Sequence, residues 1–329
     1  MPNDATTRTA KLRDIPLIKR LAESGIVLDS ELAFTRAADG PDSAVLSSIV
    51  LPQRSLVTLV TRCDDERVVG QIRLKPSEHL AQIVYIAPPP EEPAHDTAWL
   101  QILDAMAEQA GKRGAHVLAA EVDESSQLFV TMRTAGFAVY ARQEIWRRLP
   151  GQGPLKVEPA PLVVETDADT MDIQLLYCNI VPRLVQQIAV PSSDSTGLVY
   201  RQGNRIQGYI ALSEGKNGIY VVPYLHPDIH FHEVSAILAS AVTRSSNAAR
   251  LPVFVCMRRY QDWLSDSLIE LGFERYAEQA VMVKHIAAGI RQASFAPLPH
   301  KLEAVSSPVR PPTSQAQVTE QIVEISLQE

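Results

Sequence analysis

The stretch Gly-Phe-Ala-Val-Tyr-Ala-Arg-Gln at residues 136–143 decides the fold, because its pattern returns once more along the chain. Residues 272–279 read Gly-Phe-Glu-Arg-Tyr-Ala-Glu-Gln, with the glycine, both aromatic residues and the glutamine at the same spacing. The second copy begins 136 positions after the first. Several residue types repeated at one constant shift indicate an internal duplication rather than a chance dipeptide.

Each copy carries a second shared pattern upstream of this stretch. An apolar run, a polar turn and a strand that contains a glycine follow one another in both halves of the sequence. These segments are 55–60, 64–66 and 68–72 in the first copy, and 197–200, 202–204 and 206–210 in the second. Apolar runs separated by a short polar turn are typical of a β-hairpin, so we expect one hairpin in each copy.

The remaining periodicity predicts the same order of elements twice: a helix, three strands, a helix, a strand, a helix and a last strand. In the first copy, after an opening helix near Asp14 and the hairpin, these elements are expected at 80–86, 97–112, 116–122, 125–135 and 139–149. In the second copy a helix is expected within 170–188, followed by three strands at 197–200, 205–212 and 218–225. A helix at 233–245, a strand at 253–257, a helix that ends at 272 and a last strand at 276–285 complete the copy.

The duplication sets the predicted domain organisation. A chain of 329 residues is long enough for two domains of roughly 150 residues, each with its own core. We predict an N-terminal domain at 1–149, a linker at 150–162, a C-terminal domain at 163–293 and a tail at 294–329. The linker is rich in Pro and Gly, and the tail is rich in Pro, Ser and Gln, so we expect the tail to be disordered.

Composition and charge narrow the function classes. The net charge of −7 argues against nucleic acid or an anionic membrane as a partner, since both need concentrated Lys and Arg. The three cysteines are too few and too far apart for a disulfide framework, which favours a reducing compartment. The first residues lack the apolar core of a signal peptide, and no apolar run reaches the roughly 20 residues of a membrane span. We therefore expect a cytoplasmic protein.

The order of elements, with a helix that ends in Gly-Phe before the last strand, resembles the GNAT family of acyl-CoA-dependent N-acyltransferases. The resemblance covers both copies and implies a tandem pair of GNAT-like domains of the α/β (α+β) class. Each domain would hold a mixed, mostly antiparallel central sheet flanked by helices. The resemblance also implies acetyl-CoA or another acyl-CoA as co-substrate, an amine on a small molecule or a peptide as acceptor, and no metal.

In that family the third strand of the sheet parts from its neighbour and pairs with the pantetheine arm, and the next helix N-terminus holds the pyrophosphate. In the second copy the resemblance assigns this role to Val222 and Leu225 on the strand and to Pro227 in a Val-x-Pro motif. His230 falls on the family's Arg/Gln position and Ser235 on a glycine position. These five residues are the predicted acyl-CoA site.

Acidic residues and prolines depart from the family pattern around both loops. Glu233 stands at another glycine position in the second copy, where a carboxylate opposes a pyrophosphate. In the first copy, Ile86-Ala87-Pro88 matches the motif, but prolines, Glu91 and Asp96 follow it. We therefore expect at most one active copy, the second.

Many family members place a tyrosine four residues before the Gly-Phe, as the acid for the departing thiolate. That position is Met132 in the first copy and Leu268 in the second, and Gln261 replaces a family asparagine in the second copy. Glu121 is our candidate base for an ammonium substrate, the alternative being a surface carboxylate that caps the next helix. Tyr224 is our candidate acid, the alternative being a packing role in a strand.

Two further clusters carry open alternatives. His226, His230 and His232 are spaced like zinc ligands, or they form a polar loop at a helix start. The pair Arg258-Arg259 could clamp an acidic substrate or a CoA phosphate, although solvated strand ends more often carry such pairs.

These observations leave three hypotheses. The first is an N-acyltransferase with an unidentified amine acceptor. The second is a non-catalytic GNAT-like protein for interaction or ligand sensing, with the tail at 294–329 as a docking segment for a protein partner. The third is a zinc-dependent hydrolase built on the histidine cluster.

Overall fold

The computed structural model describes residues 6–22, 24–36, 56–63, 66–74, 79–91, 96–153, 155, 157–188 and 195–286. These residues belong to one compact unit that holds both copies. The predicted tail at 294–329, residues 92–95 of the first-copy loop and part of the first hairpin turn lie outside the described residues.

Both copies contain the predicted order of elements. The first copy comprises β1 (Thr6–Thr9), α1 (Ile15–Ala22), β2 (Ile26–Val27), α2 (Ser30–Arg36), β3 (Leu56–Cys63), β4 (Glu66–Leu74), β5 (Leu80–Ala87), α4 (Thr97–Lys112), β6 (Val117–Asp123), α5 (Gln127–Thr134) and β7 (Ala138–Arg148). The second comprises β8 (Leu162–Val164), α6 (Thr170–Ile180), β9 (Thr196–Gln202), β10 (Arg205–Glu214), β11 (Ile219–Leu225), α7 (Phe231–Arg244), β12 (Val253–Arg258), the 3₁₀ helix η6 (Arg259–Leu264), α8 (Ser265–Glu270) and β13 (Glu274–His285). The sequence did not predict β1, β2, α2 or β8.

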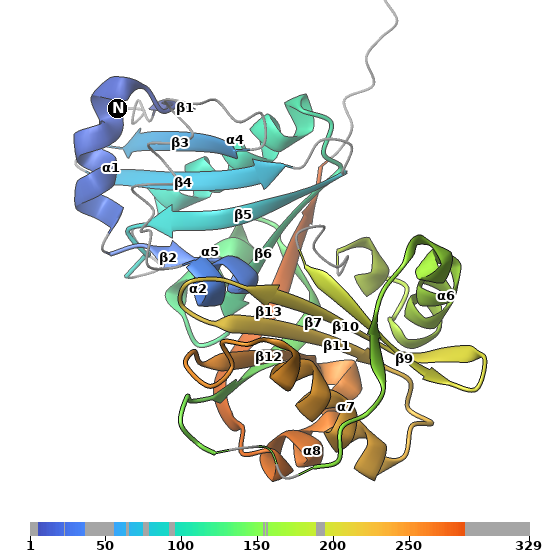
Figure 1. Ribbon diagram of the computed structural model, residues 1–329. Helices are drawn as coiled ribbons and strands as arrows, with labels where there is room; N and C mark the ends of the chain where they lie inside the picture. Colours follow the sequence, from blue (N-terminus) through green and yellow to red (C-terminus); the bar gives the residue numbers. More distant parts are fainter. Residues whose placement is uncertain are drawn as a thin grey trace, which may run out of the picture. The chain divides into compact units, whose positions relative to one another are not determined.

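The strands form one continuous mixed sheet (Figure 1). Its order is β1-β3-β4-β5-β6-β13-β7-β12-β11-β10-β9-β8, with β2 added beside β5. The hairpins β3–β4 and β9–β10 are antiparallel, as predicted, whereas β5 runs parallel to β6 and β11 runs parallel to β12. The predicted mixed, mostly antiparallel architecture is confirmed.

The two copies exchange their last strands. β13 of the second copy pairs with β6 of the first, and β7 of the first copy pairs with β12 of the second. The exchanged strands also pair with each other, with Gln143 directly opposite Gln279. The Gln143 side-chain amide donates to Gln279 Oε1 at 2.8 Å, so the repeated glutamines meet at the junction of the copies. The predicted domain boundaries stay a prediction.

The repeated Gly-Phe pair ends the last helix of each copy in the same way. Gly136 and Gly272 have φ angles of 85° and 77°, which residues other than glycine rarely adopt. The following Phe137 N–H donates to the Met132 carbonyl at 3.0 Å, and Phe273 repeats this bond to Leu268 at 2.9 Å. This is the Schellman arrangement, in which the residue after the glycine packs back on the helix. The duplicated motif is therefore a helix stop.

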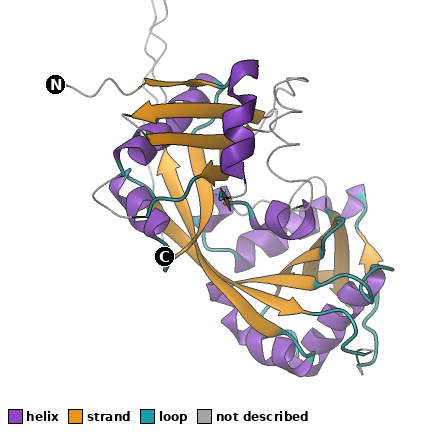
Figure 2. Ribbon diagram, turned by 90° about the vertical axis from the view of Figure 1, so that its left-hand side faces the viewer, coloured by secondary structure: helices purple, strands orange, loops and turns teal. Residues whose placement is uncertain are grey.

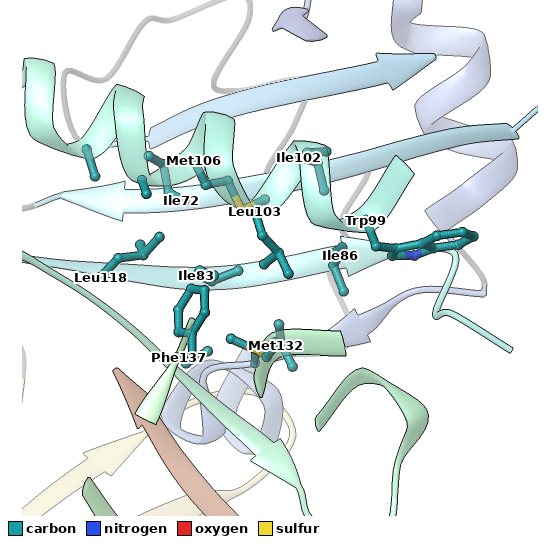
Figure 3. Packing of buried hydrophobic residues seen from close by; sticks show 14 of the residues in the cluster. Ile72, Ile83, Ile86, Trp99, Ile102, Leu103, Met106, Leu118, Met132 and Phe137 are labelled. Carbon is teal, nitrogen blue, oxygen red and sulfur yellow. The ribbon is translucent and has the colours of Figure 1, made fainter. Parts of the chain in front are cut away.

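Helices cover both faces of the sheet, and apolar clusters fill the layers between them (Figure 2). In the first copy, Ile102 and Met106 of α4 pack over strand residues such as Ile83, while Phe137 and Met132 complete the same cluster (Figure 3). A second cluster lies under α7 and α8. None of the helices in the described part of the chain has the length and hydropathy of a membrane-spanning segment.

Candidate functional site

The first copy keeps a parted strand pair, but its own chain fills the gap. β5 and β6 pair only over Leu80–Gln82 and Val117–Ala119, and beyond them the two strands separate. The turn between β2 and α2 bridges the opening (Figure 1). The Leu28 N–H donates to the Val84 carbonyl of β5, and the Leu28 carbonyl accepts from the Glu121 N–H of β6, each at 3.0 Å. The backbone of Leu28 therefore already forms hydrogen bonds with the strand carbonyl and N–H groups that a ligand in this opening would need.

This bridge is anchored on all sides. The Leu28 side chain is 1% exposed and belongs to the main apolar cluster of the first copy. Gln82 Nε2 donates to the Leu28 carbonyl at 3.0 Å, and Arg73 forms an ion pair with Asp29 at 2.5 Å. A ligand arm could enter only if part of the core unpacked.

The second copy has the same parted strands with a different closure. β11 and β12 pair over Ile219–Val221 and Val253–Val255 and then separate. The buried side chain of Gln261, in η6, reaches back to β11. In the amide orientation that satisfies both partners, its nitrogen donates to the Pro223 carbonyl at 3.0 Å and its oxygen accepts from the Leu225 N–H at 3.1 Å. One side chain therefore forms hydrogen bonds with both the carbonyl and the N–H that β11 presents to this opening.

The predicted acyl-CoA residues of the second copy lie along this opening and the helix after it. Val222 is half-buried directly beyond the last pair with β12, and Leu225 offers its N–H while its side chain is buried. Pro227 is exposed, and His230 is the exposed N-cap residue of α7, with no side-chain capping bond. Ser235 is buried, and its hydroxyl donates to Glu270 Oε2 at 2.6 Å, which turns it away from the helix start.

The first turn of α7 carries the acidic residue that the sequence identified. Glu233 Oε2 is buried and has no hydrogen-bond partner among the residues that the structure describes. Burial, and then the Glu233 carboxylate, raise the pKa of Tyr200 on β9. The rings of His230 and His232 stack with centroids 5.9 Å apart. Within the described ranges no group of three His, Cys, Asp or Glu residues is arranged to hold a metal ion.

Both candidate catalytic residues lie beside one buried arginine, Arg258, at the end of β12. Glu121 comes from the first copy: its Oε2 accepts from the Ser30 N–H at 2.7 Å, and its Oε1 lies 3.8 Å from Arg258 Nη2. Tyr224 comes from the second copy, is 3% exposed, and is close enough for the charge of Arg258 to act on its phenol. The shared sheet thus brings residues of both copies to one place.

Arg258 is not the solvated strand end that its sequence suggested. It is buried at 8% exposure as the last residue of β12, whereas its neighbour Arg259 begins η6 and is exposed. Its Nε and Nη1 atoms have no hydrogen-bond partner in the described part of the chain, and neither has the Tyr260 hydroxyl. Burial lowers the pKa of Arg258, but Cys256 and Glu121 raise it above its ordinary value overall, so the guanidinium stays charged.

The aromatic groups around Arg258 are neutral. Burial raises the pKa of Tyr260 to about 12 and raises the pKa values of Tyr177 and Tyr224 further. Burial also raises the pKa of the Cys256 thiol, which therefore stays protonated and unreactive. At neutral pH these phenols are hydrogen-bond and proton donors, and the local charges are Arg258 and Glu121.

A cavity of about 160 Å³ adjoins this group, between α6 and the strands β10 and β11. Tyr177, Tyr209 and Tyr224 line it together with Ile173 and Leu176 of α6, so its wall is mostly hydrocarbon. The rings of Tyr177 and Tyr224 lie with centroids 5.7 Å apart. Tyr260, which follows Arg258 by two residues in η6, belongs to the same apolar cluster as Tyr177 and Tyr224, so the cavity lies beside this part of the chain.

Comparison with solved structures identifies the architecture. The structure superposes on a tandem GNAT protein from the clavulanic acid biosynthesis pathway with a TM-score of 0.53 and 16% identity, covering 86% of this chain and 99% of that one. The chain has the tandem GNAT fold. A GNAT-family N-acetyltransferase from Sphaerobacter thermophilus gives a TM-score of 0.53 at 12% identity, covering 87% of this chain and 97% of that one. No protein-family model matches the sequence, and no curated protein matches it.

The GNAT fold explains which site features the sequence could reveal. The resemblance of the sequence to the GNAT family indicated the parted strands, Glu233 and Gln261. All of these lie around the opening of the second copy. The positions of the missing family tyrosine, Met132 and Leu268, are fully buried, so hydrocarbon packing replaces a proton donor there. Leu28 could not be found from the sequence, because the segment between β2 and α2 is too short for any periodicity.

Proposed function

We propose that this protein is an acyl-CoA-dependent N-acyltransferase in which the second copy takes the acyl-CoA and an amine on a small molecule or a peptide is the acceptor. The observation that carries the proposal is the difference between the two openings. Backbone closes the first, whereas among the residues that the structure describes the Gln261 side chain closes the second. A side chain can leave by a rotamer change, and the Pro223 carbonyl and Leu225 N–H would then be free to pair with the pantetheine amides.

Residues of both copies would serve the transfer. The amine nitrogen forms a bond to the thioester carbonyl carbon, the carbon–sulfur bond breaks, the ammonium gives up a proton and the thiolate takes one. Glu121 is the group to accept the first proton, since its Oε1 has only the 3.8 Å approach to Arg258. Tyr224 is the group to supply the second, because its raised pKa keeps the phenol protonated.

The start of α7 fits a pyrophosphate only in part. The helix has 14 residues and presents N–H groups and a partial positive charge at His230 and Phe231. Glu233 opposes this charge within the first turn. The residues present therefore favour weak binding of a CoA pyrophosphate, and removing the Glu233 charge should strengthen it.

The test is calorimetric titration of the full chain with acetyl-CoA and with a longer acyl-CoA. We expect saturable binding that becomes about five- to tenfold tighter in Glu233→Gln, since a like charge near a phosphate is unfavourable by roughly 1 kcal/mol. Gln261→Ala should also tighten binding, because it uncovers the β11 groups. Glu91→Gln is the matched control in the first copy and should change nothing, since Leu28 closes that opening.

Each outcome decides between functions. Binding that responds to Glu233 and Gln261 but not to Glu91 supports acyl-CoA in the second copy, and acyl transfer to an amine panel completes the case. No binding by the wild type or by either second-copy variant rejects the proposal.

A second candidate function has its own observation in support. The family's proton donor is replaced by the buried Met132 and Leu268, and the glycine positions carry Glu233 and the internally bonded Ser235. These features favour a non-catalytic GNAT-like protein for ligand sensing or interaction, with residues 294–329 as the partner-binding segment. Ligand binding without any acyl transfer distinguishes it from the enzyme.

A further inference from the structure

Arg258 is a buried cation with unused hydrogen-bonding capacity. A guanidinium carries five N–H donors, and an unpaired buried charge is strongly unfavourable. Its approach to Glu121, 3.8 Å, is longer than a hydrogen bond, and its Nε and Nη1 atoms have no partner in the described chain. Buried polar groups without partners are rare, so a ligand that supplies acceptors explains these atoms.

The neighbouring phenol points to the same kind of ligand. The Tyr260 hydroxyl is buried and also lacks a partner in the residues described. It is neutral at physiological pH, so it can donate a hydrogen bond beside the guanidinium. A set made only of donors, one of them a planar fork, matches the two acceptor oxygens of a carboxylate.

Charge and volume restrict the ligand further. Glu121 balances part of the Arg258 charge, which favours a monoanion over a phosphate dianion. The adjoining cavity of about 160 Å³ is close to the roughly 150 Å³ of an apolar cavity that holds benzene. Its wall of tyrosine rings and the aliphatic Ile173 and Leu176 suits a hydrocarbon group of that size.

We propose that Arg258 and Tyr260 bind the carboxylate of a small apolar acid or amino acid, and that its hydrocarbon side chain occupies the cavity between α6 and β11. The carboxylate site itself is independent of acyl transfer. The identification of the bound amino acid as the acceptor rests on the proposed function, since Glu121 and Tyr224 flank the same arginine.

The experiment titrates the full chain, without CoA, with matched probes. L-phenylalanine and phenylacetate carry the carboxylate, whereas phenylacetamide and phenethylamine keep the ring and lack it. We expect the two carboxylates to bind at least tenfold more tightly than the amide and the amine. Tyr260→Phe, which removes one oxygen, should weaken carboxylate binding about tenfold, and Arg258→Lys should weaken it more, because lysine lacks the fork.

Arg259→Lys is the control, since it makes the same exchange at the adjacent exposed residue and should leave binding unchanged. Equal binding of phenylacetate and phenylacetamide overturns the inference, as does unchanged carboxylate affinity in Tyr260→Phe, a variant that keeps the fold even if Arg258→Lys does not. Carboxylate binding without acyl transfer rejects only the acyltransferase. Transfer to phenethylamine as efficient as transfer to phenylalanine, with an unchanged KM in Arg258→Lys, rejects only the carboxylate site.

Discussion

The two copies of this duplicated fold close the same opening with different parts of the chain. In the first, the backbone of Leu28 joins β5 to β6, and its side chain is part of the apolar core. In the second, the carboxamide of Gln261 covers the corresponding groups of β11, with no other partner for them in the described ranges. The first closure forms as the protein folds and cannot open separately, whereas the second depends on one rotamer.

This difference shows how a duplication can divide its tasks. The first copy contributes structure and also Glu121, whose backbone N–H holds the Leu28 bridge while its carboxylate faces Arg258 of the second copy. The second copy contributes the opening and the cavity. The exchange of β7 and β13 makes this division workable, because it places β6 and β12 in one sheet, separated only by the two exchanged strands.

The largest expected effect separates the two closures by stability. Leu28→Ala should lower the free energy of unfolding by about 3 kcal/mol, since it leaves a cavity in a packed core. Gln261→Ala should lower it by only about 1 kcal/mol, because it removes two hydrogen bonds next to an opening. Urea denaturation followed by circular dichroism measures both losses.

Leu184→Ala is the control for the leucine change, because Leu184 is 51% exposed and should lose less than about 0.5 kcal/mol. Equal losses for the Leu28 and Gln261 variants would contradict the distinction between a core closure and a side-chain closure.

The first helices of the two copies, α1 and α6, offer a second comparison. Each follows an aspartate whose contribution to stability depends on pH. Asp14 accepts two bonds from Arg8, at 2.6 and 2.7 Å, and one from the Lys11 N–H at 2.8 Å. The Arg8 contacts are the main cause that lowers the pKa of Asp14 to about 2. Asp169, directly before α6, accepts hydrogen bonds from the Thr166 N–H and hydroxyl, each at 2.8 Å, and pairs with Arg201; its pKa is lowered too, chiefly by the Thr166 hydroxyl.

A carboxylate whose folded-state pKa is depressed stabilises the fold above its unfolded-state pKa and loses this effect as the pH falls. Asp14→Asn should therefore lower stability by about 1.5 kcal/mol at pH 7, after allowance for the partly exposed Arg8. The gap to the wild type should narrow as the pH falls from about 4 towards 2. Asp169→Asn should change stability in the same direction by a smaller amount, because its guanidinium contact is not bidentate. Urea midpoints across this pH range provide the measurement, and a gap that widens in acid would refute the assignment.

The sequence predicted the elements of both copies because their signals are local. The Gly-Phe stop needs a positive φ and a buried aromatic ring, and the hairpins need a polar turn, so each leaves a mark at fixed positions. The strand exchange leaves no such mark, since Ile145 on β7 and Val281 on β13, 136 positions apart, are equivalent and both buried, so either strand could pair with β6 or β12.

The site was predictable only where the family pattern reached it. Glu121 is a candidate base in the first copy and Tyr224 a candidate acid in the second, each on its own local pattern. Nothing in the sequence indicates that Arg258 lies near both. The pair Arg258-Arg259 suggests a solvated strand end, but β12 ends at the buried Arg258 and η6 begins at the exposed Arg259. Arg258 is still paired within the sheet, opposite Gln143 of β7, and this pairing is a tertiary property.

The smallest expected difference is between the repeated glutamines, which are equivalent in sequence but not in their contacts. Gln279 Oε1 accepts two hydrogen bonds, from Ser30 Oγ and from Gln143 Nε2, both at 2.8 Å. Gln143 Oε1 receives only the weak thiol donor of Cys256, at 3.5 Å. Gln279→Met would leave two donors without an acceptor, whereas Gln143→Met leaves the Ser30 bond in place.

We therefore expect Gln279→Met to lower the free energy of unfolding by about 1.5 kcal/mol and Gln143→Met by about 0.5 kcal/mol less. The double variant should lose less than the sum, because the two residues share one hydrogen bond. A double-mutant cycle in urea measures this coupling. Equal losses in the two single variants would mean that the copies are symmetric at their junction. The hydrogen bond from Ser30 to Gln279 would then add nothing to the stability of that junction.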